Sequence, residues 1–222
     1  MKRNLSSAFT LIELLVVISI IALLAAIATP VYGVAMRNAR MTAALANARS
    51  IGLSLRLFSE ENGGVFPAGK NAYGEQIVTA NDAFRSLLPT YCDNETIFAL
   101  PNSKAGPRAD GRIATPADIL APGENHWAYI AGLSTTSNST WPLVVDHTDG
   151  SGHYTTNETS RGGTWKGTQA LVIRCDISAS KVPMLGSGSK RYLPRFDDPS
   201  RNALQVADYM GEGAHLLEPA AQ

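Results

Sequence analysis

The 222-residue sequence has few charges, and neither sign is in excess. Lysine plus arginine and aspartate plus glutamate number 19 each, so the formal net charge is zero. Because no basic excess is present, we expect no nucleic-acid partner. Charged residues make up 17% of the chain, below the roughly one quarter of an ordinary domain. Part of this shortage comes from one long segment that is almost free of charge.

Motifs of catalysis and of phosphate binding are also missing. The nucleophile pattern Gly-x-Ser-x-Gly does not occur, and the glycine-rich stretch 186–190 lacks the spacing of a phosphate-binding loop. We therefore expect that the protein is not an enzyme. An exported hydrolase is the least favoured hypothesis, because the sequence contains no recognisable catalytic constellation.

The segment from Phe9 to Thr29 contains 21 residues and one charge, the carboxylate of Glu13. As a helix it would be roughly 31 Å long, enough to cross a bilayer core of about 30 Å. A lone acid at mid-membrane costs on the order of 2.5–3.5 kcal/mol. No basic residue lies within the segment. The sequence therefore predicts that the partner of Glu13 comes from another chain or from a charge created by processing.

The residues around Glu13 resemble the class III signal of type IV pilins and of type II secretion pseudopilins. A short leader carrying Lys2 and Arg3 precedes Phe-Thr-Leu-Ile-Glu-Leu, which begins at Phe9. The resemblance implies that prepilin peptidase cuts between Ala8 and Phe9 and that the new amine of Phe9 is methylated. Glu13 then becomes the fifth residue of the mature chain, where the family keeps a glutamate. Ala8 departs from the glycine that usually precedes the cut.

The resemblance also implies a structural function. Such a subunit assembles into a periplasmic pseudopilus or pilus, and we expect one that serves a type II secretion system. Its partners would be prepilin peptidase, copies of itself, other pseudopilins and an inner-membrane assembly platform. In the filament, Glu13 would pair with the amine of Phe9 on a neighbour. The alternative function is a membrane-anchored periplasmic binding protein or adhesin that does not polymerise.

Two other interpretations of the apolar segment compete with this resemblance. Ala26-Ile27-Ala28 fits the cleavage site of an ordinary secretory signal, but the apolar run exceeds the usual length of about 7–15 residues. An anchor that is never cut explains the length but not Glu13. In the prepilin and anchor interpretations, the leader charges keep the N-terminus cytoplasmic. The chain would cross the inner membrane once and carry its head in the periplasm until assembly.

The pattern divides the chain into a leader (1–8), a membrane half-helix (9–29), an amphipathic half-helix (30–62) and an exported head (63–222). Pro30 should kink the helix, because proline lacks an amide hydrogen and clashes with the preceding turn. Helical spacing then resumes, and Gly63-Gly64 ends it. We expect one apolar stripe to pack on the head, formed by Met41, Leu45, Ala48, Ile51, Leu55 and Phe58.

The sequence predicts an α+β fold in which the long N-terminal helix packs on a small antiparallel β head rich in loops. Four strands are expected, at Trp127–Ala131, Pro142–Asp146, Ala170–Cys175 and Lys181–Leu185, the last two forming a hairpin. Short helices are expected at Asn81–Leu88, capped by Asn81 or Asp82, and at Asn202–Met210. Residues 101–125 and 147–163 read as loops, and residues 218–222 should fray.

A second resemblance supports the hairpin. Lys166 to Asp176 is similar to the His-x9-Asp-Gly element of pilin-like proteins common in planctomycete-type bacteria. Lys166 stands where that element has histidine, and Ile177 stands where it has glycine. The match is partial, and it implies only a pseudopilin-like β head.

Candidate metal ligands gather after the second predicted strand, at Asp146, His147, Asp149 and His153. Oxygen ligands in a glycine-rich loop suit calcium, so Asp146 and Asp149 are weak candidates for a Ca²⁺ site. The spacing fits no EF-hand, and a solvated turn is the simpler interpretation. Two histidines alone do not complete a zinc site. We expect no other cofactor.

The two cysteines, Cys92 and Cys175, both lie in the predicted exported head. An oxidising compartment would permit one disulfide that closes a long loop. Two separate buried thiols are the alternative. The sequence leaves both open, because it does not contain the distance between the two residues.

Overall fold

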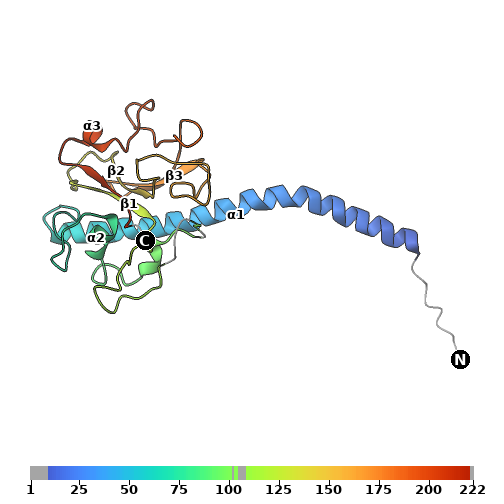
Figure 1. The fold of residues 1–222 in the computed structure, drawn as a ribbon, viewed down its shortest axis with the longest axis horizontal. Coiled ribbons are helices and arrows are strands. Elements are labelled where there is room, and N and C mark those ends of the chain that lie inside the picture. Colours follow the sequence, from blue (N-terminus) through green and yellow to red (C-terminus); the bar gives the residue numbers. More distant parts are fainter. Residues whose placement is uncertain (1–9, 102, 105–108, 221–222) are drawn as a thin grey trace. The chain divides into compact units, whose positions relative to one another are not determined.

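The computed structural model describes residues 10–101, 103–104 and 109–220 (Figure 1). The chain forms two compact units, residues 1–40 and residues 41–222. Helix α1 (Leu11–Glu61) begins in the first unit and ends in the second. The second unit contains α2 (Ala80–Arg85), the 3₁₀-helix η1 (Glu95–Phe98), β1 (Trp127–Ala131), β2 (Pro142–Asp146), β3 (Gln169–Arg174), β4 (Ala179–Pro183), α3 (Val206–Met210) and β5 (His215–Leu217). This confirms the predicted α+β class.

The head is organised around one five-stranded sheet of order β4-β3-β2-β1-β5, in which all neighbouring strands are antiparallel. Strands β1 and β2 have the predicted bounds. The edge strand β5 was not predicted, because three residues are too few to show an alternating pattern. It pairs with β1, where Ala131 lies opposite His215.

The β3–β4 hairpin forms, but both strands begin earlier than the sequence predicted. The turn covers Cys175 to Ser178, and the amide of Arg174 donates to the Ser178 carbonyl at 3.0 Å. Ile177 makes this tight turn at a φ of 66°, a conformation that favours glycine. Ile177 therefore occupies a backbone position that glycine would adopt with less strain.

The second half of α1 covers one face of the sheet. Met41, Ala48, Ile51 and Leu55 are at most 2% exposed, which confirms the predicted stripe. Leu45 and Phe58 are partly buried against the same core. A Cβ added at Gly52 would lie 3.0 Å from Ile177 Cγ2 and 3.2 Å from Ile173 Cγ2. The missing side chain thus lets the helix approach the hairpin closely.

The other face of the sheet is covered by the chain from β4 to α3, drawn in orange and red in Figure 1. Side chains alternate between the faces of a strand. Ile173 accordingly points to α1, whereas Val172 and Arg174 line a cavity with Leu193 and Tyr209. The sheet is therefore the middle of three layers in the head.

Helix α1 ends at Glu61, and the glycines that follow turn the chain back. Gly63 and Gly64 have φ values of 66° and 83°. The amide of Gly64 donates to the carbonyl of Ser59 at 2.7 Å, which satisfies a carbonyl of the last helical turn. At residue 30, where the sequence predicts a kink, α1 continues as one helix. The kink at Pro30 stays a prediction.

Two predicted helix boundaries are wrong, both because an asparagine side chain bonds elsewhere. Helix α2 is capped by Thr79, which forms a capping box with Asp82, and Asn81 lies inside the helix. The Asn81 amide instead donates to the carbonyl of Leu120 at 2.8 Å. Helix α3 begins at Val206 rather than Asn202, whose side chain organises a preceding turn.

The C-terminal tail is docked as far as residue 220, which corrects the expected fraying from residue 218. The Glu218 carbonyl accepts from the Ala80 amide at 3.0 Å. The amide of Ala220 donates to Asn81 Oδ1 at 3.0 Å, and its carbonyl accepts from Gly123 at 3.0 Å. The tail thus joins the start of α2 to a distant loop.

Both cysteines are free thiols in this structure, and of the two only Cys175 is buried. Cys92 is half-buried and its sulfur lies 3.4 Å from the Asn94 carbonyl. Cys175 is buried at the end of β3, where burial raises its pKa to about 12. Each thiol makes contacts of its own rather than closing a loop.

Candidate functional site

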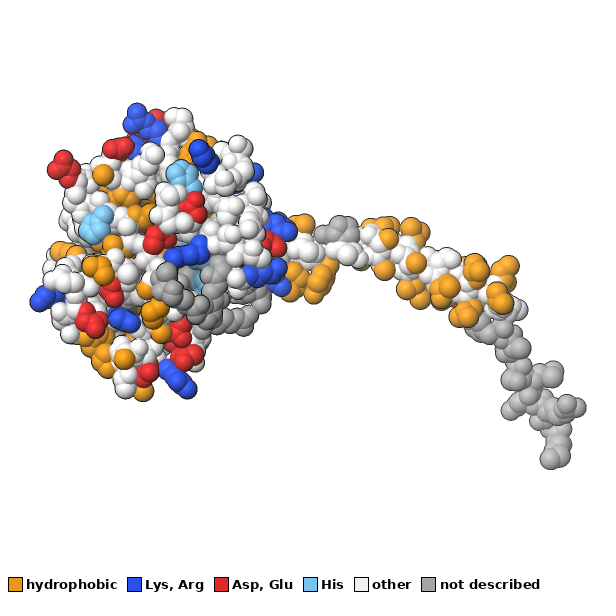
Figure 2. Space-filling view, viewed as in Figure 1, with side chains coloured by type: hydrophobic (Ala, Val, Ile, Leu, Met, Phe, Trp, Pro, Cys, Tyr) orange, Lys and Arg blue, Asp and Glu red, His pale blue; other side chains and the backbone are white. Residues whose placement is uncertain are grey.

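The first half of α1 is apolar on every side. Its large hydrophobic side chains from Leu11 to Val34 are between 44% and 81% exposed. Figure 2 shows groups of orange hydrophobic side chains along the visible face of that helix. A window in α1 is long and apolar enough to cross a membrane. A helix that is hydrophobic all round must be covered by lipid or by other helices.

Polar groups inside this apolar helix are satisfied by the helix itself. The hydroxyl of Ser19 donates to the Leu15 carbonyl at 2.7 Å. The hydroxyl of Thr29 donates to the Ala25 carbonyl at 2.7 Å. In hydrocarbon, an unpaired hydroxyl would cost free energy. Both side chains are therefore compatible with an apolar environment.

Glu13 closes the N-terminal turn of α1. Its Oε2 accepts from the Thr10 amide at 2.9 Å and from the Thr10 hydroxyl at 2.7 Å. The Glu13 amide donates to Thr10 Oγ1 at 3.2 Å. This is a capping box, in which the first and fourth residues of Thr-Leu-Ile-Glu satisfy each other's backbone groups. Glu13 therefore already has a hydrogen-bond partner, Thr10, inside the apolar segment.

The capping box also places the carboxylate in a favourable field. Backbone amides at a helix N-terminus carry a partial positive charge, which stabilises an acid in the first turn. The signal for this role is present in the sequence as Thr10 followed three residues later by Glu13. The predicted cleavage residues Ala8 and Phe9 lie outside the described residues, immediately before this turn.

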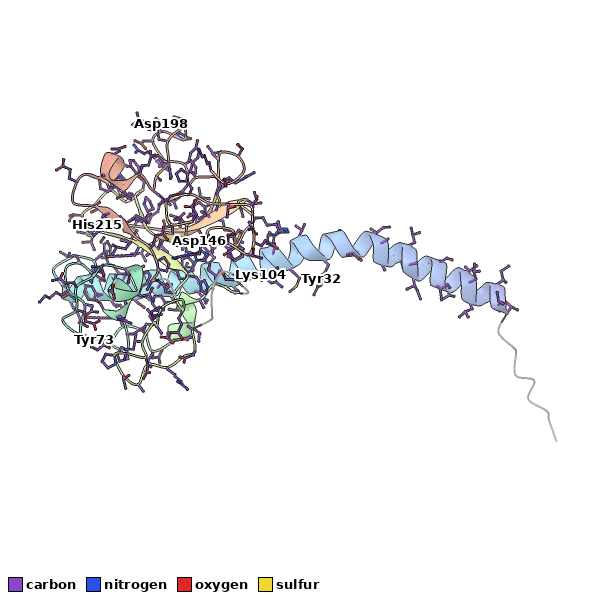
Figure 3. All side chains as sticks on the ribbon, in the orientation of Figure 1. Tyr32, Tyr73, Lys104, Asp146, Asp198 and His215 are labelled. Carbon is purple, nitrogen blue, oxygen red and sulfur yellow. The ribbon has the colours of Figure 1, made fainter. Side chains whose placement is uncertain are left out.

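The structure places the two calcium candidates in separate hydrogen-bond networks. Asp146 is buried in the sheet (Figure 3), and its Oδ1 accepts from the Leu171 amide at 2.8 Å. Asp149 lies in the following loop, where its Oδ1 accepts from the Ser151 amide and hydroxyl at 2.8 and 2.7 Å. Asp149 is exposed in a turn after a strand, in agreement with the simpler interpretation of a solvated turn.

Burial controls the protonation of Asp146. It raises the pKa of this carboxyl to about 8, because the charged form is taken out of water, and the Leu171 amide opposes the shift only in part. For Asp149, burial also raises the pKa, but hydrogen bonds from Ser151 and His153 outweigh it and the pKa is lowered. The two carboxyl groups therefore lie in different electrostatic surroundings.

The two histidines of the predicted loop, His147 and His153, also differ in burial and in hydrogen-bond partners. His147 is buried, lies 3.2 Å from Thr164 Oγ1 through its Nε2, and packs edge-on against His126 at 5.3 Å between ring centres. Burial lowers the pKa of His147 to about 3 and that of His126 to about 4. His153 instead contacts Ser151 at the surface of the loop. His147 and His153 thus have different hydrogen-bond partners.

The described residues contain a different acidic group, formed by Glu95, Asp110 and Glu124. One ligand oxygen from each of the three lies within 4.8 Å of the others. Glu95 also accepts from the amides of Gly111 and Leu120. Burial raises the pKa of Glu95 and of Glu124, and neighbouring carboxylates add to both shifts. Carboxylate oxygens are the ligands that Ca²⁺ and Mg²⁺ prefer, so these residues could hold a divalent cation.

Sequence reasoning missed this acidic group because its members come from three separate turns. Glu95 begins η1, and the other two lie in the proline-rich stretch predicted only as loop. No short spacing links them, and only the folded loop brings them together.

Comparison with known proteins identifies the N-terminal segment. Residues 3–29 match the family model of the prokaryotic N-terminal methylation motif, which is the prepilin signature of type IV pilins and pseudopilins. Searches of curated proteins and of solved structures each find no match. The motif supports a type IV pilin-like prepilin subunit and implies processing by prepilin peptidase.

Proposed function

We propose that this prepilin-like chain is a structural subunit that is cleaved between Ala8 and Phe9 and assembled into a periplasmic pseudopilus or pilus. A pseudopilus of a type II secretion system is the assembly that we favour, because the N-terminal segment resembles its subunits. The observation that carries the proposal is the match of residues 3–29 to the methylation motif, on a helix that is apolar all round.

The exposed apolar helix explains how the subunit changes partners. Before assembly, lipid covers the side chains from Leu11 to Val34, and the leader charges keep the N-terminus in the cytoplasm. During assembly, the same surface leaves the lipid and packs against the helices of neighbouring subunits. Helix packing in an apolar environment depends on close side-chain contact rather than on exclusion of water. An inner-membrane platform would supply the subunits.

Cleavage gives Glu13 a second partner. It creates a charged amine on Phe9, one residue before the Thr10 that caps α1. In the filament, the Glu13 carboxylate would accept a hydrogen bond from the Phe9 amine of a neighbouring subunit. This bond would either replace the bonds from Thr10 or form beside them. A charge pair in an apolar surrounding is stable only when both members are satisfied, so this pairing would also fix the register between subunits.

The first prediction concerns processing. Protein extracted from membranes of the native host should begin at Phe9 and carry a methylated amine, as shown by N-terminal mass spectrometry. Ala8→Gly is the matched variant, because it restores the residue usual before the cut and should be processed at least as fully. An intact Met1 or a start at Thr29 would contradict the proposal. An uncut chain would favour the tethered binding protein or adhesin.

The second prediction separates the two roles of Glu13. Glu13→Gln keeps an acceptor for the capping box but removes the charge, so α1 should still begin normally while filament formation is lost. Thr10→Ala removes the cap hydroxyl and keeps the charge, so filaments should persist at a reduced level. Filament recovery at matched membrane levels measures both. Wild-type filament yield from Glu13→Gln would mean that no charge pair forms.

A further inference from the structure

The head contains a cavity of about 190 Å³ that the prepilin function does not use. It lies on the face of the sheet opposite α1, between the strands and the segment that leads to α3. Its apolar walls include Val172, Val182 and Leu193. Phe196 also lines it and is 73% exposed, so the cavity communicates with solvent beside a large aromatic side chain.

Two arginines line this cavity. Arg195 is only 5% exposed, and its guanidinium lies 4.6 Å from the ring centre of Tyr209. Its Nε donates to the Asn202 carbonyl at 3.3 Å, and its Nη2 donates to the Gln205 carbonyl at 3.5 Å. Arg174 reaches the cavity from β3 and donates through Nη1 to Ser180 Oγ at 2.6 Å. All of these acceptors are neutral.

Within the described part of the chain, neither guanidinium has a carboxylate within 4.0 Å. Asp198, labelled in Figure 3, is influenced by the charge of Arg195, but its carboxylate accepts from Ser200 and pairs with Arg201 at 3.4 Å. A buried cation with no carboxylate in direct contact is compensated only in part, and an arriving carboxylate would stabilise it. The cavity thus combines positive charge with apolar walls.

We propose that this cavity binds a small organic carboxylate with one ring-sized apolar body. The size fits, because engineered cavities of about 150 Å³ accept benzene. The planar guanidinium fork of arginine matches the two oxygens of a carboxylate, so Arg174 and Arg195 would hold the charged end. The ring would contact Val172, Val182 and Leu193. The inference is independent of filament assembly and would hold for an unassembled subunit.

The test uses the full chain in lipid nanodiscs and three probes. Benzoate carries both the ring and the charge, benzyl alcohol carries the ring alone, and acetate carries the charge alone. Saturation-transfer NMR titrations should show millimolar binding of benzoate. Binding of the other two should be at least roughly tenfold weaker, because each lacks one half of the recognition.

Variants locate the binding. Arg174→Gln should weaken the binding of benzoate at least roughly fivefold and leave the affinity for benzyl alcohol unchanged. Arg174 is half-buried, so this variant avoids the folding risk of replacing the buried Arg195. Lys190→Gln removes an exposed cation outside the cavity lining, so it is the control and should bind like the wild type. Any of three results would overturn the proposal: equal affinity for benzoate and benzyl alcohol, a benzoate titration that does not saturate, or a benzoate affinity that is the same in Arg174→Gln as in the wild type.

Discussion

Ile51 offers the sharpest test of how α1 joins the head. Its side chain is fully buried, and Ile51→Ala would remove three carbons from the core. At about 0.8 kcal/mol for each carbon, the lost burial is about 2.4 kcal/mol, and the cavity left behind brings the total to roughly 3–4 kcal/mol. With a urea dependence of about 2 kcal/mol per molar, the unfolding midpoint of a fragment covering residues 34–222 should fall by roughly 1.5–2 M.

Leu53 is the matched control. It lies two residues further along the same helix, is also a branched aliphatic residue and is 58% exposed. Leu53→Ala should change the free energy of unfolding by less than about 0.5 kcal/mol. Urea unfolding of both variants, followed by circular dichroism, measures the difference. Equal midpoints for Ile51→Ala and Leu53→Ala would show that the stripe does not pack on the sheet, and would refute the reasoning.

Two further predictions concern the sheet. Gly132 has a φ of 85°, and a Cβ added there would lie 2.1 Å from the Gly213 carbonyl oxygen, so Gly132→Ala should lower the stability of the head by roughly 2–4 kcal/mol. A Cβ added at Gly213 would meet nothing within 4 Å, so Gly213→Ala should change the stability little. Thermal unfolding of the two variants measures the difference. The Asp146 pKa of about 8 is raised above its unfolded value, so its contribution to stability is fully present below about pH 4 and is lost as the pH rises through about 8. Asp146→Asn should therefore gain stability relative to the wild type between pH 5 and pH 8.5, by at most on the order of 5 kcal/mol in urea titrations, and a pH-independent difference would contradict a buried, protonated Asp146.

The parts of the fold that the sequence predicted are those with a long or regular pattern. The stripe from Met41 to Phe58 repeats over five turns of helix, so one irregular position does not hide it. β1 and β2 are runs of apolar residues between turn-forming stretches, and their bounds were predicted correctly. The methylation motif was found because its residues are adjacent in the chain.

The parts that were missed depend on contacts between distant residues. The acidic group at Glu95 needs a folded loop, and β5 is recognisable only beside β1. At α2 the actual cap, Thr79, lies two positions before the nearer of the two predicted caps, and it forms the capping box with Asp82. The capping box of Glu13 was a different omission. Its signal, Thr10 followed three residues later by Glu13, is local. The cost of a charge in lipid instead favours a partner on another chain, and the sequence prediction rested on that cost alone.

The docked C-terminal tail has a consequence for the order in which the head is completed. β5 and the residues up to Ala220 close the edge of the sheet and tie down Asn81, near the start of α2. In the proposed topology the N-terminus stays in the cytoplasm and the head crosses the membrane after the apolar segment, so these residues cross last. The helix and the first four strands must wait, with one edge open, until translation and translocation finish. Nascent heads would therefore need shielding from one another, and an affinity tag fused after residue 222 would be placed beside this final closure.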